Sequence, residues 1–235
     1  MWKGARVAVI IPAYQEQRII LRTLRGIPGY VDRVYVVDDA SSDDTASLVE
    51  GYADARVSLI RHAQNRGVGA AIATGYTAAL NEGLEALAVM AADDQMHPDD
   101  LAPLIDAVVS GTADYAKGNR FAHPRATDMP FARRSAGRVL SALTRLATGL
   151  RVQDTQCGYT ALSARTARTL SWSELWPRYG YPNDLLGLLA ARGARVQDVP
   201  VRPVYADEDS GIRPWHAFSV AGVIARRWWR TRVRL

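Results

Sequence analysis

Short, continuous apolar runs alternate with segments of helical periodicity along the first half of this chain, and this alternation constrains the fold most. The first run, VAVIIP at residues 7–12, has no polar interruption, which is typical of a strand buried on both faces of a sheet. We expect further strands at 33–39, 56–62, 85–94 and 113–120, and helices within 16–27, 45–53, 65–83 and 98–111. Such alternation predicts an α/β fold with a mostly parallel central sheet and helices on both faces.

The pattern becomes less regular after residue 120. A proline-containing polar loop leads into an amphipathic helix that ends at Thr148, and we expect a helix over 181–193 and a late strand over 194–205. No repeat, low-complexity segment or linker divides the chain. We therefore expect one domain over 1–212, followed by a basic, tryptophan-rich amphipathic helix over 213–235.

Polar clusters follow four successive predicted strands. They lie at 14–16, 38–43, 65–69 and 93–95. Ligands of open α/β sheets bind beyond the carboxyl ends of the strands, so these clusters are expected to meet in one crevice.

The stretch LAVMAADDQMHPDD is the most informative of the four, because an apolar run ends abruptly in acids. Asp93 offers a carboxylate and Gln95 an amide oxygen, and hard cations prefer oxygen ligands. Pro98 and the two acids behind it also suit the first turn of a helix. The two interpretations are compatible, so we expect a metal site followed by a helix start.

Composition excludes several classes of protein. Hydrophobic residues make up 48% of 235 residues, enough for a sizeable core. Cys157 is the single cysteine, which excludes a disulfide framework, and the four histidines lack zinc-site spacing. The N-terminus reads as a first strand and not as a signal peptide. We expect a cytoplasmic protein, with the inner face of the membrane as one location open to it.

Six motifs occur in an order that resembles family 2 glycosyltransferases. They are IIPAYQE, VVDDASSDDT, NRGVGAA, MAADDQMHP, KGNR and DTQCGYTAL. The resemblance covers residues 7–205 and is closest to the branch of dolichol-phosphate mannose synthases and bacterial polyprenyl-phosphate sugar transferases. It implies a GT-A, Rossmann-like fold and an inverting transfer from a UDP- or GDP-linked sugar to a polyprenyl phosphate, with Mg2+ or Mn2+.

The resemblance also implies a donor site. Its candidate residues are Pro12, Tyr14, Glu16, Asp39, Arg66, Ala92, Asp93 and Arg120. Asp39 matches the family acid that contacts the base or ribose. Neighbouring side chains of a strand point to opposite faces, so Asp38 is expected to be structural. Gly67 and Gly69 would let backbone N–H groups approach the diphosphate.

The metal site departs from the family pattern at one position. The family has an aspartate where this chain has Ala91, which leaves Asp93 and Gln95 as the expected metal ligands. A nucleotide-sugar-binding protein without turnover is therefore one alternative function.

Two acids compete for the role of catalytic base, Asp154 and Asp184. A lipid-phosphate acceptor is already an oxyanion near neutral pH and needs little base catalysis, whereas the hydroxyl of a soluble glycan or small molecule would need it. Arg133, Arg134 and Arg202 are the candidates for binding the acceptor, and the segment YADEDSGIR occupies the place of a family loop that closes on the donor.

The C-terminal segment carries six arginines and no acid after residue 212. Its apolar run is too short to span a bilayer, which needs about 20 residues. One expectation is a peripheral contact with an anionic membrane through Trp215, Phe218, Val223, Ile224 and Trp228. The other is a terminal helix packed on the domain. No nucleic-acid-binding motif accompanies the basic charge, so nucleic acid is not expected as a partner.

Overall fold

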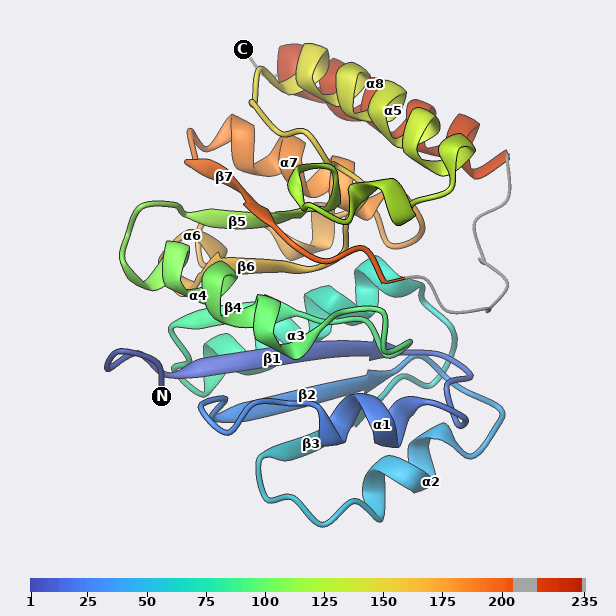
Figure 1. The fold of residues 1–235 in the computed structure, drawn as a ribbon, viewed down its shortest axis with the longest axis vertical. Helices are drawn as coiled ribbons and strands as arrows, with labels where there is room; N and C mark the ends of the chain where they lie inside the picture. The colour runs from blue at the N-terminus through green and yellow to red at the C-terminus, as the bar shows by residue number, and fades with distance from the viewer. Residues whose placement is uncertain (205–214, 234–235) are drawn as a thin grey trace.

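The computed structural model describes residues 1–204 and 215–233, and side chains in the last helix from 220 to 230. Within these residues a seven-stranded sheet has the order β3-β2-β1-β4-β6-β5-β7 (Figure 1). The strands are β1 (Val7–Ala13), β2 (Arg33–Asp38), β3 (Val57–Arg61), β4 (Ala86–Val89), β5 (Tyr115–Asn119), β6 (Thr160–Ser163) and β7 (Val196–Pro200). The helices are α1 (Ile20–Arg25), α2 (Thr45–Glu50), α3 (Val68–Asn81), α4 (Leu101–Val109), α5 (Phe131–Thr148), α6 (Ala164–Ala167), α7 (Tyr181–Ala191) and α8 (Trp215–Val233).

The sheet is mostly parallel, as predicted. β1 pairs in parallel with β2 and β4, and β7 pairs in parallel with β5. The exception is β6, which runs antiparallel between β4 and β5 and was not predicted as a strand. Its four residues, TALS, are too few to show a period of their own, and no helix separates them from the polar loop before them.

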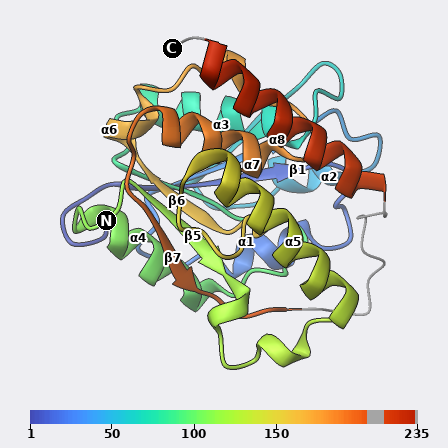
Figure 2. The ribbon, with the colours of Figure 1, turned by 90° about the horizontal axis from the view of Figure 1, so that it is seen from above.

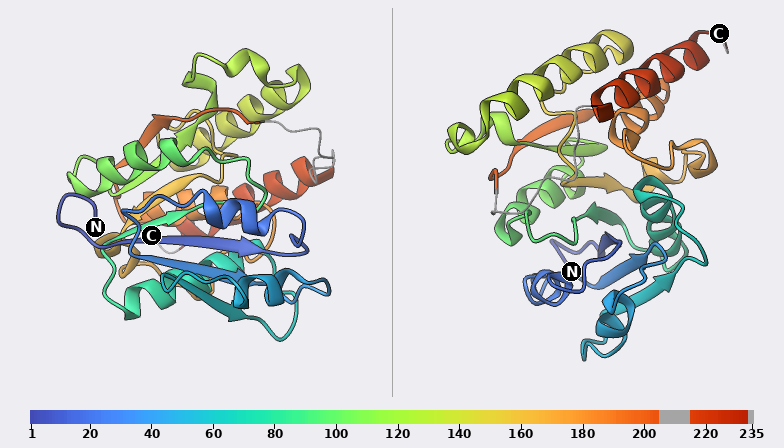
Figure 3. Two further views of the ribbon diagram at one scale, coloured as in Figure 1. Left: turned by 60° about the horizontal axis from the view of Figure 1, so that its bottom comes forward. Right: turned by 90° about the vertical axis from the view of Figure 1, so that its right-hand side faces the viewer.

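Helices cover both faces of the sheet, which confirms the predicted architecture. On one face, α1, α2 and α4 pack on side chains of β1, β2 and β4 in a core that includes Ile11, Leu24 and Leu104. On the other face, α3, α6 and α7 enclose a second core that includes Ile72 and Tyr76. Figure 3 shows the sheet between these two layers.

The two longest helices form an additional layer. α5 and α8 lie side by side beyond α7, which both contact (Figures 1 and 2). On α8 the side chains of Val220, Val223 and Ile224 are buried. Val223 and Ile224 therefore belong to the packed side of the helix and are not exposed to a membrane, while the side chains of Trp215 and Phe218 lie outside the described residues. Across 1–204 and 215–233, none of the helices is long and apolar enough to cross a bilayer.

Candidate active site

The loops that follow β1, β2 and β4 lie next to one another because these strands are adjacent and parallel. Each loop holds a non-glycine residue in the left-handed region: Gln15 with φ 58°, Ala40 with φ 63° and Asp94 with φ 56°. Such backbone is unfavourable for residues with a Cβ, and it gathers at sites where function fixes the geometry. This edge of the sheet is therefore the first place to look for a ligand site.

A cavity of about 260 Å³ opens at this edge. Asp93, Gln95, Arg120 and Arg202 line it, and so do side chains that follow β5 and precede α7. The remaining lining residues are Val68, Ala91, Met96, Gln156, Cys157, Gly158, Tyr159, Tyr179, Gly180, Tyr181, Pro182, Val201 and Val204. The structure thus brings together the predicted metal ligands, the predicted donor-binding Arg120 and the predicted acceptor-binding Arg202.

The loop after β4 fixes Asp93 at the cavity. The Asp93 carboxylate accepts a hydrogen bond from the backbone N–H of Gln95 at 3.1 Å, and the buried Ala92 presents its carbonyl to the Thr23 hydroxyl at 2.8 Å. Asp94 turns away and pairs with Arg22 at 2.6 Å. Ala92 therefore positions the loop through its backbone, and Asp94 is a surface acid.

The oxygen donors at the cavity fit a hard divalent cation. No three His, Cys, Asp or Glu side chains within the described ranges form a complete metal cluster. Mg2+ and Mn2+ in nucleotide sites take few protein ligands, because the phosphates and water supply the rest. A carboxylate from Asp93 and an amide oxygen from Gln95 match that requirement.

Arg120 owes its position to Asp154. The fully buried Asp154 carboxylate accepts from Arg120 Nε at 2.7 Å, from Nη2 at 3.0 Å and from the backbone N–H at 3.2 Å. Burial alone would raise the pKa of Asp154, but the charge and hydrogen bonds of Arg120 outweigh it and hold that pKa below its usual range. A permanently ionised, fully bonded carboxylate is a poor base. In this geometry Asp154 holds Arg120 at the cavity.

The two acids at the end of β2 have different surroundings in the structure. Asp39 holds the loop before α3: its carboxylate accepts from the backbone N–H groups of Arg66 at 2.9 Å and Gly67 at 2.6 Å, and lies 2.7 Å from Nδ1 of His62. Asp38 is equally buried, yet its Oδ1 has no hydrogen-bond partner among the described residues. A buried, unsatisfied carboxylate oxygen is costly, and a ligand N–H would satisfy it.

The predicted residues after β1 lie beside Asp38. Ala13 of β1 is the register partner of Asp38, and its chain neighbours are Pro12, still within β1, and Tyr14. The backbone N–H of Glu16 donates to the Thr45 hydroxyl at 2.8 Å, which ties this loop to the one after β2. Tyr14 is 46% exposed, which is enough to offer its ring to a base.

The start of α3 reaches the cavity through Val68, but its backbone N–H groups are bonded within the protein. The backbone N–H groups of Gly69 and Ala70 donate to the carbonyl of Pro177, at 2.8 and 3.2 Å. Protein therefore occupies the helix N-terminus that was predicted to receive the diphosphate. The Arg66 side chain lines a separate groove with Ile60 and Pro177, away from Asp93.

Asp184 is not placed to act as a base. It is fully buried near the start of α7 and forms a bidentate ion pair with Arg227 at 2.8 and 2.6 Å. It does not line the cavity. Asp184 lies in the first turn of α7, whose N-cap is Gly180, and its partner is an arginine 43 residues away.

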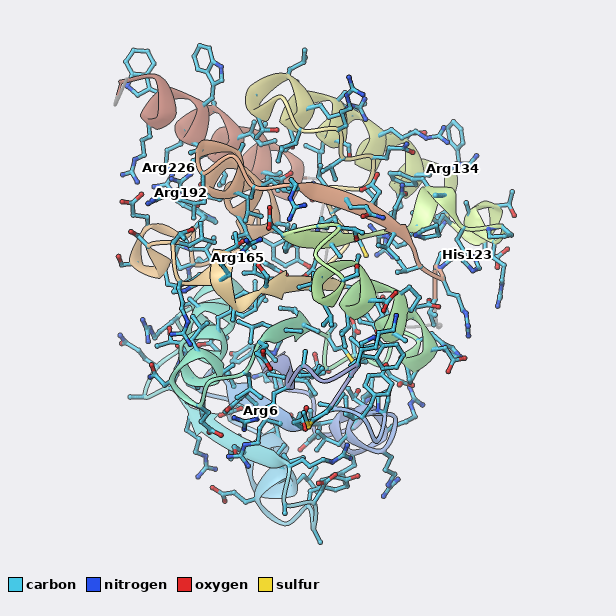
Figure 4. The ribbon with its side chains drawn as sticks, turned by 90° about the vertical axis from the view of Figure 1, so that its left-hand side faces the viewer. Arg6, His123, Arg134, Arg165, Arg192 and Arg226 are labelled. Carbon is cyan, nitrogen blue, oxygen red and sulfur yellow. The ribbon has the colours of Figure 1, made fainter. Side chains whose placement is uncertain are left out.

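The three predicted acceptor arginines have different surroundings. Arg202 lines the cavity and is held by its backbone N–H, which donates to Asp100 at 2.7 Å, and by Nη1, which lies 2.8 Å from Nδ1 of His97. Arg133 and Arg134 lie in the first turn of α5 and not in the loop before it. Figure 4 shows Arg134 on the same side of the molecule as His123. The segment from residue 205 to 214 lies outside the described residues.

Two tyrosines of the cavity were not predicted. Tyr179 and Tyr181 flank Gly180, which begins α7 with φ 96°. Burial, followed by the charge of Asp93, raises the pKa of Tyr179, so its hydroxyl stays protonated near neutral pH. The spacing Tyr-Gly-Tyr-Pro could have marked a helix start, but nothing in it shows which ligand group the rings would face.

Comparisons with known proteins show the family of the chain. The family model described as glycosyl transferase family 2 matches residues 8–166. A UDP-N-acetylglucosamine–dolichyl-phosphate N-acetylglucosaminyltransferase of Methanococcus voltae is 28% identical over 86% of each chain. An undecaprenyl-phosphate mannosyltransferase of Micrococcus luteus is 31% identical over 83% of this chain and 82% of its own.

A solved structure shows the same fold. Glucosyl-3-phosphoglycerate synthase from Mycobacterium tuberculosis, in complex with Mn2+, UDP and glucosyl-3-phosphoglycerate, superposes with a TM-score of 0.71 at 22% identity. The match covers 96% of this chain and 81% of that chain.

Proposed function

The chain belongs to glycosyltransferase family 2, and from this premise we propose that it transfers a sugar from a nucleotide-sugar donor to a polyprenyl-phosphate acceptor. One observation carries the proposal: Asp93, Gln95 and Arg120 share one cavity at the carboxyl edge of the sheet. Relatives whose names state transfer to dolichyl or undecaprenyl phosphate support the acceptor.

The donor would lie across the ends of β1, β2 and β4. Asp38 would accept an N–H of the base through its unpartnered oxygen, and Tyr14 would contact the base beside it. The diphosphate would reach Asp93 and Gln95, and Arg120 would donate to it from the floor of the cavity. A cation held there would neutralise the charge that develops on the leaving diphosphate. The solved relative with UDP and Mn2+ makes a uridine nucleotide the first donor to test.

The proposed transfer is a single displacement at the anomeric carbon. An acceptor phosphate oxygen attacks the anomeric carbon from the face opposite the diphosphate, the new C–O bond forms as the old one breaks, and the configuration inverts. Arg120 stabilises the negative charge that grows on the departing oxygen. No proton has to be removed from a phosphate oxyanion. The occupation of both predicted bases, Asp154 and Asp184, by arginines favours this acceptor over a hydroxyl.

An acceptor with a long lipid tail requires access to a membrane, and α5 offers a surface for it. Exposed apolar residues repeat along this helix at spacings of three and four: Ala132, Ala136, Val139, Leu143 and Leu146. The helix carries four arginines and no acid, and the neighbouring α8 exposes Trp228 and Trp229. An apolar stripe flanked by cations matches an anionic lipid surface. We therefore place the peripheral membrane contact on α5 and on the outer side of α8.

The experiment that tests the proposed function measures nucleotide release from UDP- and GDP-sugars, with and without a detergent-solubilised polyprenyl phosphate. Asp93→Asn should lower turnover by about 100-fold, on the scale of losing one stabiliser of transition-state charge. Asp94→Asn is the matched control, since Asp94 pairs with Arg22 outside the cavity, and it should stay close to wild type. Full activity of Asp93→Asn in the presence of EDTA would contradict the proposed cation site. Release that depends on a soluble hydroxyl acceptor, and not on the lipid, would contradict the proposed acceptor.

A further inference from the structure

The buried ion pair between Asp184 and Arg227 joins the C-terminal helix to α7. Arg227 Nε donates to Oδ1 at 2.8 Å and Nη2 donates to Oδ2 at 2.6 Å, with side chains 8% and 0% exposed. The stem of Arg227 crosses α7 at Gly187, where a Cβ would lie 2.3 Å from Arg227 Cγ. Only glycine leaves room for this crossing, so Gly187 allows the Arg227 side chain to pass over α7.

The same pair holds the segment that precedes α7, residues 174–180. The backbone N–H of Trp176 donates to the Asp184 carboxylate at 2.8 Å, and Arg227 Nη2 donates to the carbonyl of Glu174 at 2.9 Å. Arg226 lies over the ring of Trp176, 4.9 Å from its centroid, on the side of α8 that faces the rest of the molecule (Figure 4). Two consecutive arginines of α8 thus fix the backbone and a side chain of the 174–180 segment.

The 174–180 segment forms one wall of the cavity. It contributes Tyr179 and Gly180 to the lining, and the charge of Asp93 acts on the Tyr179 hydroxyl. Its Pro177 carbonyl accepts from Gly69 and Ala70 at the start of α3. A shift of the segment would therefore move Tyr179 relative to Asp93 and would also release the N-terminus of α3.

Stability alone does not require a charged pair at this place. A buried ion pair is often no better than apolar packing of the same volume, whereas a bidentate arginine–carboxylate contact fixes orientation. We propose that Arg227, through Asp184, is a positioning residue for the sugar transfer: α8 holds the 174–180 segment so that Tyr179 stays at the cavity. The kinetic part of this inference rests on the proposed function, and the structural part does not.

The experiment compares Arg227→Gln and Asp184→Asn with Arg195→Gln. Arg195 forms a bidentate pair with Asp114, at 3.1 Å through both Nε and Nη2, and does not line the cavity. Its side chain is 55% exposed, so it controls for loss of a bidentate arginine–carboxylate pair at the surface. Hydrogen exchange is followed in peptides covering 66–72 and 174–182. The Kd of the nucleotide, and the KM and kcat for the polyprenyl phosphate, are measured in parallel.

In Arg227→Gln and Asp184→Asn we expect faster exchange in both peptides and a loss of about tenfold or more in kcat/KM for the lipid phosphate, because a small misplacement of a positioning group is enough for such a loss. The nucleotide Kd should stay near wild type. Arg227→Lys keeps the charge and should recover part of the loss, and Arg195→Gln should show neither effect.

Native exchange and native kinetics in a folded Arg227→Gln would overturn the inference. So would a parallel loss of nucleotide binding, which would make the pair merely structural. If Arg227→Gln does not fold, Asp184→Asn decides in the same way, because it removes the charge and keeps the shape. If the wild type transfers no sugar to lipid phosphate, the proposed function fails, and the exchange measurements still decide whether α8 holds the segment.

Discussion

At the scale of single residues, two adjacent carboxylates at the end of β2 have different hydrogen-bond partners. Asp39 binds backbone N–H groups and His62, whereas Asp38 keeps one buried oxygen without a partner in the described part of the chain. The alternation of side chains along a strand predicts that the two must differ. It does not predict which one faces the ligand, because that depends on where the loop before α3 closes.

The assignment of Asp38 to the nucleotide base gives a direct prediction. Asp38→Asn keeps the size of the side chain and presents an amide in place of one acceptor oxygen, so the nucleotide Kd should rise by about tenfold, near the value of one charged hydrogen bond. Calorimetric titration with UDP and GDP measures it.

Asp39→Asn serves as the comparison for this prediction. It should chiefly lower thermal stability, because Asp39 binds the loop at 66–67. Equal nucleotide affinity in wild type and Asp38→Asn would show that a residue other than Asp38 contacts the base.

Asp154 gives a second prediction at this scale, which concerns pH. The pKa of Asp154 in the folded protein lies below the usual aspartate value of about 3.9, so the carboxyl stays ionised through the pH range of a kinetic assay. A depressed carboxylate pKa stabilises the fold above about pH 4, and that contribution disappears as the pH falls through the folded-state value. Asp154→Asn should therefore lower the free energy of unfolding by about 3 kcal/mol at pH 7, as expected when a buried pair loses one partner.

The kinetic consequence separates positioning from base catalysis. If Asp154 only holds Arg120, Asp154→Asn lowers kcat but leaves the shape of the pH profile between pH 5 and 9 unchanged. The disappearance of an acidic limb from the profile in this variant would show instead that Asp154 accepts a proton. Urea unfolding and a pH series of kcat/KM measure the two quantities.

At the scale of elements, β1, β2 and β4 were predictable because each is a continuous apolar run followed by polar residues, and the helices between the strands were predictable from their helical periodicity. β6 was not predictable, since four residues give no period and its antiparallel pairing depends on strands more than 40 residues away. The cavity residues Asp93, Gln95 and Arg120 followed from strand ends and from the resemblance. The ion pair of Asp184 with Arg227 did not, because no local pattern links a helix start to a helix near the C-terminus.

The contact between α3 and the 174–180 segment is tight enough to test by one methyl group. A Cβ on Gly69 would lie 2.2 Å from the carbonyl oxygen of Trp176 and 2.9 Å from Cβ of Tyr181. Gly69→Ala should therefore displace the wall of the cavity and lower the free energy of unfolding by about 1–3 kcal/mol, the usual cost of overpacking. Chemical denaturation measures the change.

Gly222→Ala is the matched control for this prediction. Gly222 is also helical, and nothing lies within 4 Å of its added Cβ. Alanine should raise the free energy of unfolding there by about 0.5–1 kcal/mol through helix propensity. If the two substitutions had the same effect, the close approach at Gly69 would not be important.

At the scale of the whole molecule, the layer of α5 and α8 relates the cavity to its surroundings. The described side chains of α8 put Val220, Val223 and Ile224 inward, so the sequence-based choice of the membrane-facing residues on this helix was wrong in part. Val223 and Ile224 do share one side of the helix, as the sequence predicted, whereas Trp228 is exposed. Which element covers these residues depends on tertiary packing and cannot be read from the sequence of the helix. The exposed apolar stripe lies instead on α5.

The membrane contact gives the last prediction. Leu146 is 82% exposed and Val139 is 60% exposed on the same side of α5, with Trp229 exposed on α8. Val139→Glu with Leu146→Glu places two acids on the stripe, and it should abolish co-sedimentation with vesicles of anionic lipid at low salt, because each acid is costly in the interface and repels the headgroups. The Kd of the nucleotide should be unchanged, since neither side chain lines the cavity.

Arg61→Glu is the control, because it changes the charge by the same amount on β3, at the opposite end of the molecule in Figure 1. It should sediment like the wild type. A stripe that is apolar at spacings of three and four could also pair with a second copy of the chain. Sedimentation velocity distinguishes the two, because a dimer that the double variant converts to monomer, without any change in vesicle binding, would assign the stripe to self-association. Loss of vesicle binding from a monomer would assign it to the membrane that carries the acceptor.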